Sequence, residues 1–388
     1  VATATIEPTP YLPPMPTHPP DASLGDGYAD GELNHEDGGE PSAADSYIPP
    51  DYGYREPDCV SDPSPVLTSH ITDLSKISAI QPPAVISGNW YKNRSYLNIA
   101  SDRYGNVSSV PVYAPADAAM TGITYYLQPM SDAHGNWSDV PQYDVRLRIS
   151  CEVTYGFDHL TELAPDISEE APAQPASETR DAEKPVSIEV KAGDLIGYTT
   201  GTIVAHSWDF IFTNTTVENR FANQERYEKT GDLNAVLYAD CPYDYFEGGM
   251  GDEYRALFGG SAGVGVDAGC NTSYDVPGSI YGGWFQTPFA DEGGYAPADW
   301  GMAIAVMPDG NIRINEERVS IRLGPQHETY LDPRTVTDEH CFVSARGTGG
   351  LLGWHVFLKM LTPDTVAAAF GEGSCPKSLP DGYTVYYR

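Results

Sequence analysis

The sequence predicts a mainly β protein in which an extended N-terminal arm precedes two β domains. Short runs at 186–190, 319–323 and 354–360 alternate apolar and polar residues, which is the period of a half-buried strand. Gly, Pro, Asn and Asp, the residues that favour turns, separate these runs. Residues 1–65 are rich in Pro, Asp, Glu and Gly and poor in aliphatic residues, a composition that favours extended or disordered chain.

The chain of 388 residues is long enough for more than one core. We expect four segments, which are an acidic Pro-rich arm (1–65), a first β domain (66–216), a bridging segment with short helices (217–259) and an antiparallel barrel or sandwich (260–388). In the last segment, apolar runs at 303–307 and 312–314 flank a Pro-Asp-Gly-Asn turn, which predicts a hairpin. Its entry from Gly278 to Trp284 is vaguely similar to lipocalin-type barrels, and an interior filled by side chains is favoured over a ligand cavity.

The charge of the chain excludes two classes of partner. It carries 55 acidic and 22 basic residues, for a net charge of −33. Nucleic acids and anionic membranes require clustered Lys and Arg, so neither is an expected partner. No apolar run is long enough to predict a transmembrane segment. The sequence starts at Val1 without a charged-then-apolar leader, so we expect a secreted, extracellular or cell-surface protein whose signal peptide has been removed.

Cysteine usage and sequons also predict an extracellular protein. The six cysteines are widely spaced and lack a C-x-x-C motif, which indicates disulfides rather than a metal cluster. Six cysteines allow fifteen pairings. The favoured pairs are Cys341 with Cys375, Cys241 with Cys270, and then Cys59 with Cys151. Sequons for N-glycosylation begin at Asn93, Asn106, Asn136, Asn214 and Asn271.

Four consecutive motifs carry a resemblance to a known family. They are Val110-Pro-Val-Tyr-Ala-Pro-Ala-Asp-Ala118, Tyr155-Gly-Phe-Asp-His-Leu160, Val190-Lys-Ala-Gly-Asp-Leu-Ile-Gly197 and Ala205-His-Ser-Trp-Asp-Phe-Ile-Phe212. In this order they resemble the β-barrel core of the lysostaphin-like zinc metallopeptidases, the duplicated hybrid motif fold, over about residues 85–215. The resemblance implies a duplicated-hybrid-motif-like first domain and the groove of a cell-wall hydrolase.

The zinc ligands of that family are not found at the matching positions. The family uses the His and Asp of an H-x-x-x-D motif and the second His of an H-x-H motif. Here His70-Ile-Thr-Asp73 has another spacing, and Trp208 stands where the last His is expected. An indole N–H is only a donor and does not bind a cation. The sequence therefore favours a non-catalytic copy of the fold, not an enzyme.

By the resemblance, His159 and His206 match the family's two non-ligand histidines, which assist water activation and stabilise the oxyanion. They are the vestigial catalytic candidates, and Trp208 and Asp209 are the candidate binding residues. The alternative is that both histidines are structural residues that make ordinary hydrogen bonds. Asp209 would then orient the imidazole of His206 or face solvent.

The arm contains two further candidate features. Asp26, Asp30 and Asp37 have the spacing of positions 1, 5 and 12 of a calcium-binding loop, with a solvated acidic linker as the alternative interpretation. Calcium is thus the one candidate cofactor. Residues 1–6 alternate like a single strand, which would complete the sheet of a neighbouring copy or lie on its own domain.

Three hypotheses of function follow. The first is a secreted structural or surface protein that self-assembles through its arm into a filament or surface layer. The second is a pseudo-peptidase module that binds cell-wall glycan or peptide. The third is a secreted metal-dependent hydrolase whose ligands lie elsewhere in the sequence.

Overall fold

The computed structural model describes residues 59–388 apart from 84–85, 88–89, 104, 132–136, 177–182, 204, 230–234, 260–269, 271–274, 289–299, 308, 317–318 and 345–352. Residues 1–58 therefore lie outside the described residues. This applies to the expected calcium ligands Asp26, Asp30 and Asp37 and to the expected strand at 1–6.

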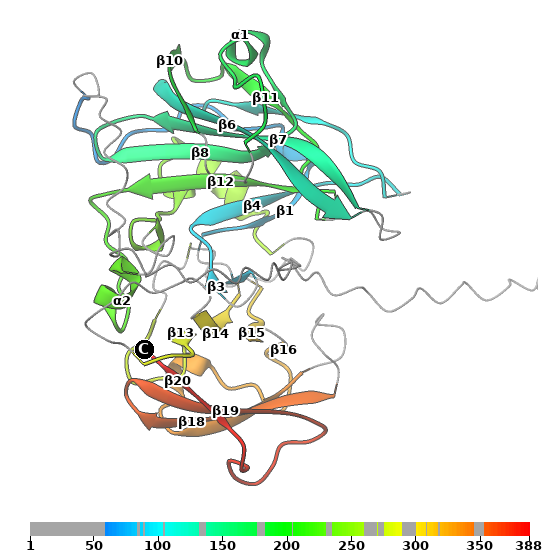
Figure 1. Cartoon of the computed structure of the whole chain (residues 1–388), viewed down its shortest axis with the longest axis vertical. Coiled ribbons are helices and arrows are strands. Elements are labelled where there is room, and N and C mark those ends of the chain that lie inside the picture. Colours follow the sequence, from blue (N-terminus) through cyan, green and yellow to red (C-terminus); the bar gives the residue numbers. More distant parts are fainter. Residues whose placement is uncertain are drawn as a thin grey trace, which may run out of the picture.

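Two large antiparallel sheets dominate the structure, one in the upper and one in the lower half of Figure 1. The first sheet has the order β1-β4-β12-β8-β7-β6-β10. Its strands are β1 (Ile77–Gln81), β4 (Arg94–Ile99), β6 (Ala118–Ser131), β7 (Trp137–Arg148), β8 (Val153–Leu160), β10 (Lys184–Val190) and β12 (Ser207–Asn214). A small sheet, β5-β11-β9, is formed by β5 (Val110–Tyr113), β9 (Glu162–Leu163) and β11 (Leu195–Thr199).

Alternation of residue types determines which face of the first sheet is buried. In β12, Trp208, Phe210 and Phe212 are fully buried, whereas the residues between them point to the other face. Phe157 on β8 packs edge-on against Trp208, with ring centroids 5.6 Å apart. These aromatic side chains join Leu97, Val145 and aliphatic residues of the small sheet in one core.

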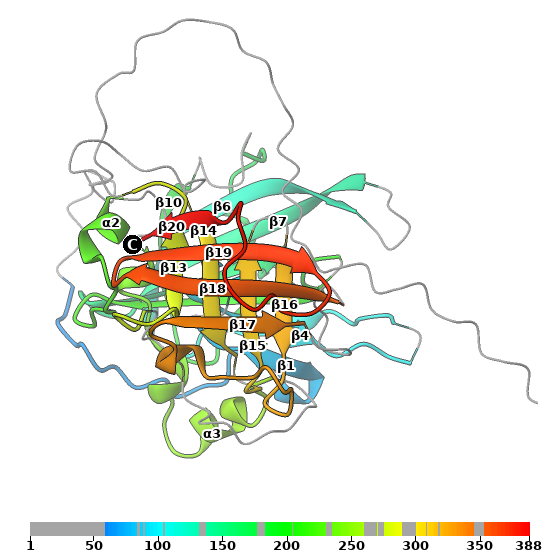
Figure 2. The same ribbon diagram turned by 90° about the horizontal axis from the view of Figure 1, so that it is seen from below.

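The second sheet curls into a nearly closed barrel. Its order is β16-β15-β14-β13-β20-β19-β18-β17, and in Figure 2 the strands β17 to β20 cross in front of β13 to β16. The strands are β13 (Gly282–Phe285), β14 (Trp300–Val306), β15 (Ile312–Glu316), β16 (Val319–Leu323), β17 (Glu339–Val343), β18 (Trp354–Thr362), β19 (Thr365–Glu372) and β20 (Thr384–Tyr387). Ser344, directly after β17, hydrogen-bonds with backbone atoms of Arg322 on β16, which joins the two ends of the sheet. Aliphatic side chains fill the space between the two layers.

These two antiparallel sheets confirm the prediction of a mainly β protein with a barrel-like C-terminal part. The predicted hairpin around 308–311 is present as β14 and β15, which pair in antiparallel register. In the part of the chain that the structure describes, no helix is long and apolar enough to cross a membrane.

Short helices flank the two sheets, and a small hairpin lies between them. The helices are η1 (Leu74–Lys76), α1 (Pro165–Ser168), α2 (Gln224–Glu228), η3 (Pro242–Asp244), α3 (Met250–Arg255) and η6 (Pro333–Thr335). The hairpin of β2 (Ile86–Ser87) and β3 (Trp90–Tyr91) reaches the second sheet, where the Tyr91 hydroxyl donates to the carbonyl of Ile304 at 3.3 Å. Between the sheets, Tyr91 belongs to a separate buried cluster with Tyr227 of α2 and Phe285 of β13.

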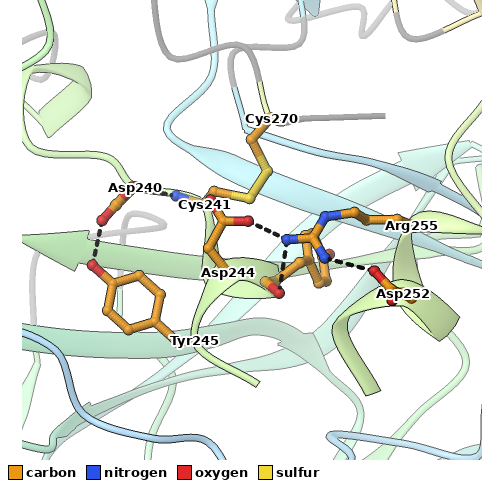
Figure 3. Close-up of a disulfide and its surroundings, with 8 residues drawn as sticks. Asp240, Cys241, Asp244, Tyr245, Asp252, Arg255 and Cys270 are labelled. Carbon is orange, nitrogen blue, oxygen red and sulfur yellow. Dashed lines mark hydrogen bonds and ion pairs between the residues drawn. A yellow bond between two sulfur atoms is a disulfide. The ribbon is translucent and has the colours of Figure 1, made fainter. Parts of the chain in front are cut away.

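The three disulfides are Cys59–Cys151, Cys241–Cys270 and Cys341–Cys375, which are the pairs favoured from the sequence. Figure 3 shows Cys241–Cys270 beside the start of η3. Near it, the Tyr245 hydroxyl donates to Asp240 at 2.5 Å, and Arg255 of α3 forms ion pairs with Asp244 and Asp252. These contacts hold the segment between the two sheets together internally.

Candidate functional site

The candidate site lies on the face of the first sheet that points away from the aromatic core. Five neighbouring strands, β4, β12, β8, β7 and β6, each contribute to it. We call it the charged cluster, and its members are Arg94, Tyr126, Asp144, Asp158, His159 and Asp209.

Strand register places two carboxylates side by side in this cluster. Asp209 on β12 pairs directly with Asp158 on β8, and because Trp208, Phe210 and Phe157 occupy the core face, both carboxylates point to the other face. Like charges directly opposite each other on neighbouring strands are destabilising. The pair therefore requires a compensating positive charge.

Arg94 on β4 provides this charge. Its Nη1 lies 2.8 Å from Asp209 Oδ2 and 3.9 Å from Asp158 Oδ2. The side chains of Arg94 and Asp209 are only 15% and 2% exposed, so solvent screens the pair weakly. Burial opposes the charge of Arg94, but Asp209, Tyr96 and Asp158 outweigh it and raise the pKa of the guanidinium.

His159 occupies the end of β8 in a left-handed backbone conformation, with φ of 67°. This conformation is uncommon for a non-glycine residue. Two hydrogen bonds hold it, from its own N–H to Asp158 Oδ1 at 2.7 Å and from Thr199 Oγ1 to its carbonyl at 2.6 Å. The imidazole Nδ1 is 3.4 Å from the Tyr126 hydroxyl, and Nε2 is 3.9 Å from Asp209 Oδ2. The ring thus lies between the two carboxylates and the phenol.

The three carboxylates, Asp144, Asp158 and Asp209, have pKa values that shift in different directions because each has different neighbours. Burial and the neighbouring Asp158 raise the pKa of Asp144 to about 7. Burial also raises the pKa of Asp209, although His159 and Arg94 oppose the shift. Asp158 is buried as well, but His159, the Tyr126 hydroxyl at 2.5 Å and Arg94 lower its pKa. The pKa of about 7 means that Asp144 holds a proton in part of the molecules near neutral pH, and burial also favours the protonated form of Asp209.

Several polar atoms around the cluster make no hydrogen bond to the described residues. They are Oδ1 of Asp144, Oδ1 of Asp209 and both side-chain polar atoms of Gln142. Gln142 lies two residues before Asp144 on β7 and is fully buried. Unpaired buried polar groups cost free energy, so this part of the sheet is less stable than a fully hydrogen-bonded one.

The structure brings together two of the four predicted site residues, His159 and Asp209. Trp208 is fully buried against Phe157, so it does not reach a ligand, and the expectation that it binds one is wrong. Strand alternation is the physical reason, because Asp209 takes the site face and its neighbour must take the core face. His206 lies in the turn before β12 with φ of 50°, where its backbone N–H donates to the Thr202 carbonyl.

The predicted sequons have different environments. Asn214 is 1% exposed, and its amide donates to the Pro63 carbonyl and the Tyr245 hydroxyl, so a glycan there is incompatible with this fold. Asn106 is exposed, and Asn93 is half-buried and accepts from Arg94 Nε at 3.2 Å. Asn136 and Asn271 lie outside the described residues.

A zinc ion, which the family resemblance implies, does not fit the cluster as it stands. Asp158, His159 and Asp209 present potential ligand atoms within 4.8 Å of one another. However, Arg94 already binds the Asp209 oxygen that also faces His159, and its fixed positive charge would repel a divalent cation placed among these groups. His70, the other histidine considered, contacts Tyr254 and Glu253 of α3 instead.

Four members of the cluster were missed by sequence reasoning, namely Arg94, Tyr126, Asp144 and Asp158. One signal was present, since the run Arg-Ser-Tyr-Leu-Asn-Ile at 94–99 alternates and puts Arg94 on the polar face of its strand. Asp158 directly precedes His159 in the motif that carries the family resemblance. Nothing in the sequence indicates that Tyr126 and Asp144 lie beside them.

Comparison of the sequence with models of known protein families finds no match. Comparisons with curated proteins and with solved structures also find none.

Proposed function

We propose that the protein is a non-catalytic, extracellular structural or surface protein. In this proposal, the first sheet has the framework of a metallopeptidase-like domain. Ion pairs within the chain stabilise the charged cluster, which stands where such a domain would bind zinc. The third hypothesis, a metal-dependent hydrolase, is less well supported by the cluster.

The position of Arg94 is the observation that carries the proposal. A catalytic zinc site needs three protein ligands and one open position for water. In the charged cluster the guanidinium lies 2.8 Å from one carboxylate oxygen of Asp209, and its fixed positive charge opposes a cation placed among Asp158, His159 and Asp209. An arginine remains charged at every physiological pH, so the positive charge that opposes a metal ion in the cluster is always present.

The three disulfides support an extracellular location, because disulfides persist in oxidising compartments. The net charge of −33 favours solubility and opposes binding to nucleic acid. Assembly through the N-terminal arm, with its strand-like residues 1–6, remains part of the proposal as the means by which copies join.

Metal analysis of the purified protein tests the non-catalytic role. After dialysis against zinc and then against zinc-free buffer, we expect far less than one zinc per chain, with no change in thermal midpoint on addition of a chelator. Arg94→Ala should increase zinc retention, because it frees Asp209 Oδ2 and removes the repelling charge. One zinc per wild-type chain together with chelator-sensitive hydrolysis of cell-wall peptides would overturn the proposal.

Sedimentation tests the assembly. The full chain and a variant without residues 1–20 should differ, with large assemblies formed only by the full chain. Addition of calcium and of a chelator to both samples separates an effect of the acidic loop that contains Asp26 and Asp30 from an effect of the strand. A full chain that remains monomeric both with calcium and with chelator would refute assembly through the arm without affecting the conclusion about the metal.

A further inference from the structure

The β6–β7 hairpin extends beyond the core of the first sheet and carries an apolar face into solvent. Ile123 and Val145 pair across the two strands and are both fully buried. The next pair on the same face is Tyr125 with Tyr143, followed by Leu127 with Pro141. We call the exposed continuation of this face the aromatic strip, and it comprises Tyr125, Leu127, Pro129, Trp137, Pro141 and Tyr143.

The strip is exposed from its middle to its outer end and half-buried at its inner end. Trp137 is 62% exposed and Leu127 is 37% exposed. Pro129 and Pro141 are exposed as well, and the half-buried Tyr125 and Tyr143 stack on each other with ring centroids 4.9 Å apart. These side chains form a small exposed apolar surface, which Asp139 interrupts opposite Pro129.

The size of the strip indicates a narrow ligand. From Tyr125 to the end of β6 the strand rises about 20 Å, and two strands with their side chains are about 10 Å wide, which gives an area of roughly 200 Å². A stable protein–protein interface buries about 800 Å² on each partner. The strip is therefore too small to hold a second copy of the chain by itself, whereas an extended polymer one unit wide would cover it.

The chemistry of the strip indicates a neutral sugar chain. Among the described pairs from Tyr125–Tyr143 to Ser131–Trp137, Asp139 is the one carboxylate on this face, and no Lys, Arg or His lies on it. Aromatic rings offer a flat apolar surface, and tyrosine adds a hydroxyl group at its edge. A pyranose ring has the complementary form, with an apolar C–H face and hydroxyl groups around it. The net charge of −33 opposes binding of an acidic polysaccharide.

We propose that the aromatic strip binds a neutral oligosaccharide, with one sugar ring on Trp137 and others along Leu127 to the Tyr125–Tyr143 pair. This moves glycan recognition from the charged cluster, where Trp208 is buried, to the hairpin. Sugar binding by the strip does not depend on whether the charged cluster holds a metal. A negative result in one test therefore leaves the other proposal unaffected.

Calorimetric titration of the full chain with the hexamer of N-acetylglucosamine and with cellohexaose tests the proposal. The protein is produced in a bacterial periplasm, so that disulfides form and the sequon at Asn136 carries no sugar. We expect saturable binding of at least one hexasaccharide and a loss of at least tenfold in affinity for Trp137→Ala and for Tyr143→Ala. Trp137→Phe should recover part of the affinity because it restores a flat ring.

Tyr383→Ala is the matched control, because Tyr383 is 44% exposed and lies before β20 in the second sheet. It should bind like the wild type. Far-UV circular dichroism of every variant checks that the hairpin still folds. The proposal is overturned if neither hexasaccharide binds at millimolar concentration, if the hairpin variants bind as tightly as the control, or if an extended apolar peptide binds more tightly than both sugars.

Discussion

Replacement of Arg94 by Met tests whether ion pairs hold the charged cluster together. Met has a similar length but no charge, so packing of the side-chain stem is largely kept. The change leaves Asp209, which is 1% exposed, next to Asp158 without the guanidinium that lies 2.8 Å from it. Removal of one partner of a buried ion pair costs about 3–5 kcal/mol, because the remaining charge is buried without compensation. We expect a loss of this size in the free energy of unfolding at pH 7.5.

The loss should depend on pH with a definite sign. Without Arg94, the pKa of Asp209 in the folded state rises further above its unfolded value, and the pKa of Asp158 loses one of the interactions that lower it. The folded variant then binds more protons than the unfolded one, so its stability falls as pH rises. The difference between wild type and Arg94→Met should thus be smaller at pH 5 than at pH 7.5.

Urea unfolding, followed by circular dichroism at both pH values, measures these differences. Lys191→Met is the matched control, because Lys191 forms an exposed ion pair with Asp117 at 3.0 Å and should show little effect. The double variant Arg94→Met/Asp209→Asn should recover much of the loss, because it removes the uncompensated charge. If Arg94→Met unfolds at the same urea concentration as Lys191→Met at pH 7.5, the cluster does not depend on Arg94 and the reasoning fails.

Three other changes have defined outcomes. The pKa of Asp144 is about 7 against an ordinary 3.8, so its contribution to the free energy of unfolding falls as pH rises through this window. Asp144→Asn should remove this pH dependence from urea unfolding, which amounts to at most about 4 kcal/mol. An unchanged profile would contradict the shifted pKa. Replacing Cys59 and Cys151 together by Ser opens a loop with a sequence separation of 92 and should cost about 2–5 kcal/mol in urea unfolding. A loss below 1 kcal/mol would show that the unfolded chain is compact without the bond. Phe285→Ala empties a fully buried position beneath Arg226, whose guanidinium carbon lies 3.7 Å from the ring centroid. The change should lower the free energy of unfolding by about 3–5 kcal/mol and make the segment between the sheets sensitive to limited proteolysis. Wild-type resistance to protease would show that this cluster does not join the two sheets.

The fold was more predictable than the site. Alternation of apolar and polar residues is a local property of the sequence, whereas the order of strands in a sheet depends on residues far apart in the chain. The runs at 186–190, 319–323 and 354–360 all form strands, β10, β16 and most of β18. By the same rule, a strand that buries Trp208 and Phe210 must turn Asp209 to the other face, so the burial of Trp208 was available from the sequence. It was missed because the family motif placed a ligand at that position.

Alternation within a strand does not predict which residues of other strands contact Asp209. Arg94 precedes it by 115 residues, and β4 reaches β12 only through a crossover between strands that are not consecutive. Asp144 lies where the register between β7 and β8 shifts, after Tyr143, and a bulge of this kind has no reliable sequence signal. Proximity across such a sheet depends on which strands pair and in which register, and a shift of one residue would move every side chain to the other face.

Charge balance explains how the cluster can be buried without a metal ion. Three carboxylates face one guanidinium, an arrangement that is unstable in a region of low dielectric constant if all three are ionised. A proton on Asp144, whose pKa is about 7, removes one negative charge. Arg94 then compensates Asp209 directly at 2.8 Å, while Tyr126 and the His159 backbone donate hydrogen bonds to Asp158. Arg94, the proton on Asp144 and the His159 imidazole, which favours the charged forms of Asp158 and Asp209, supply positive charge in place of a divalent cation. For this reason, we expect Arg94→Ala to gain zinc affinity most clearly above pH 7, where the proton is also lost.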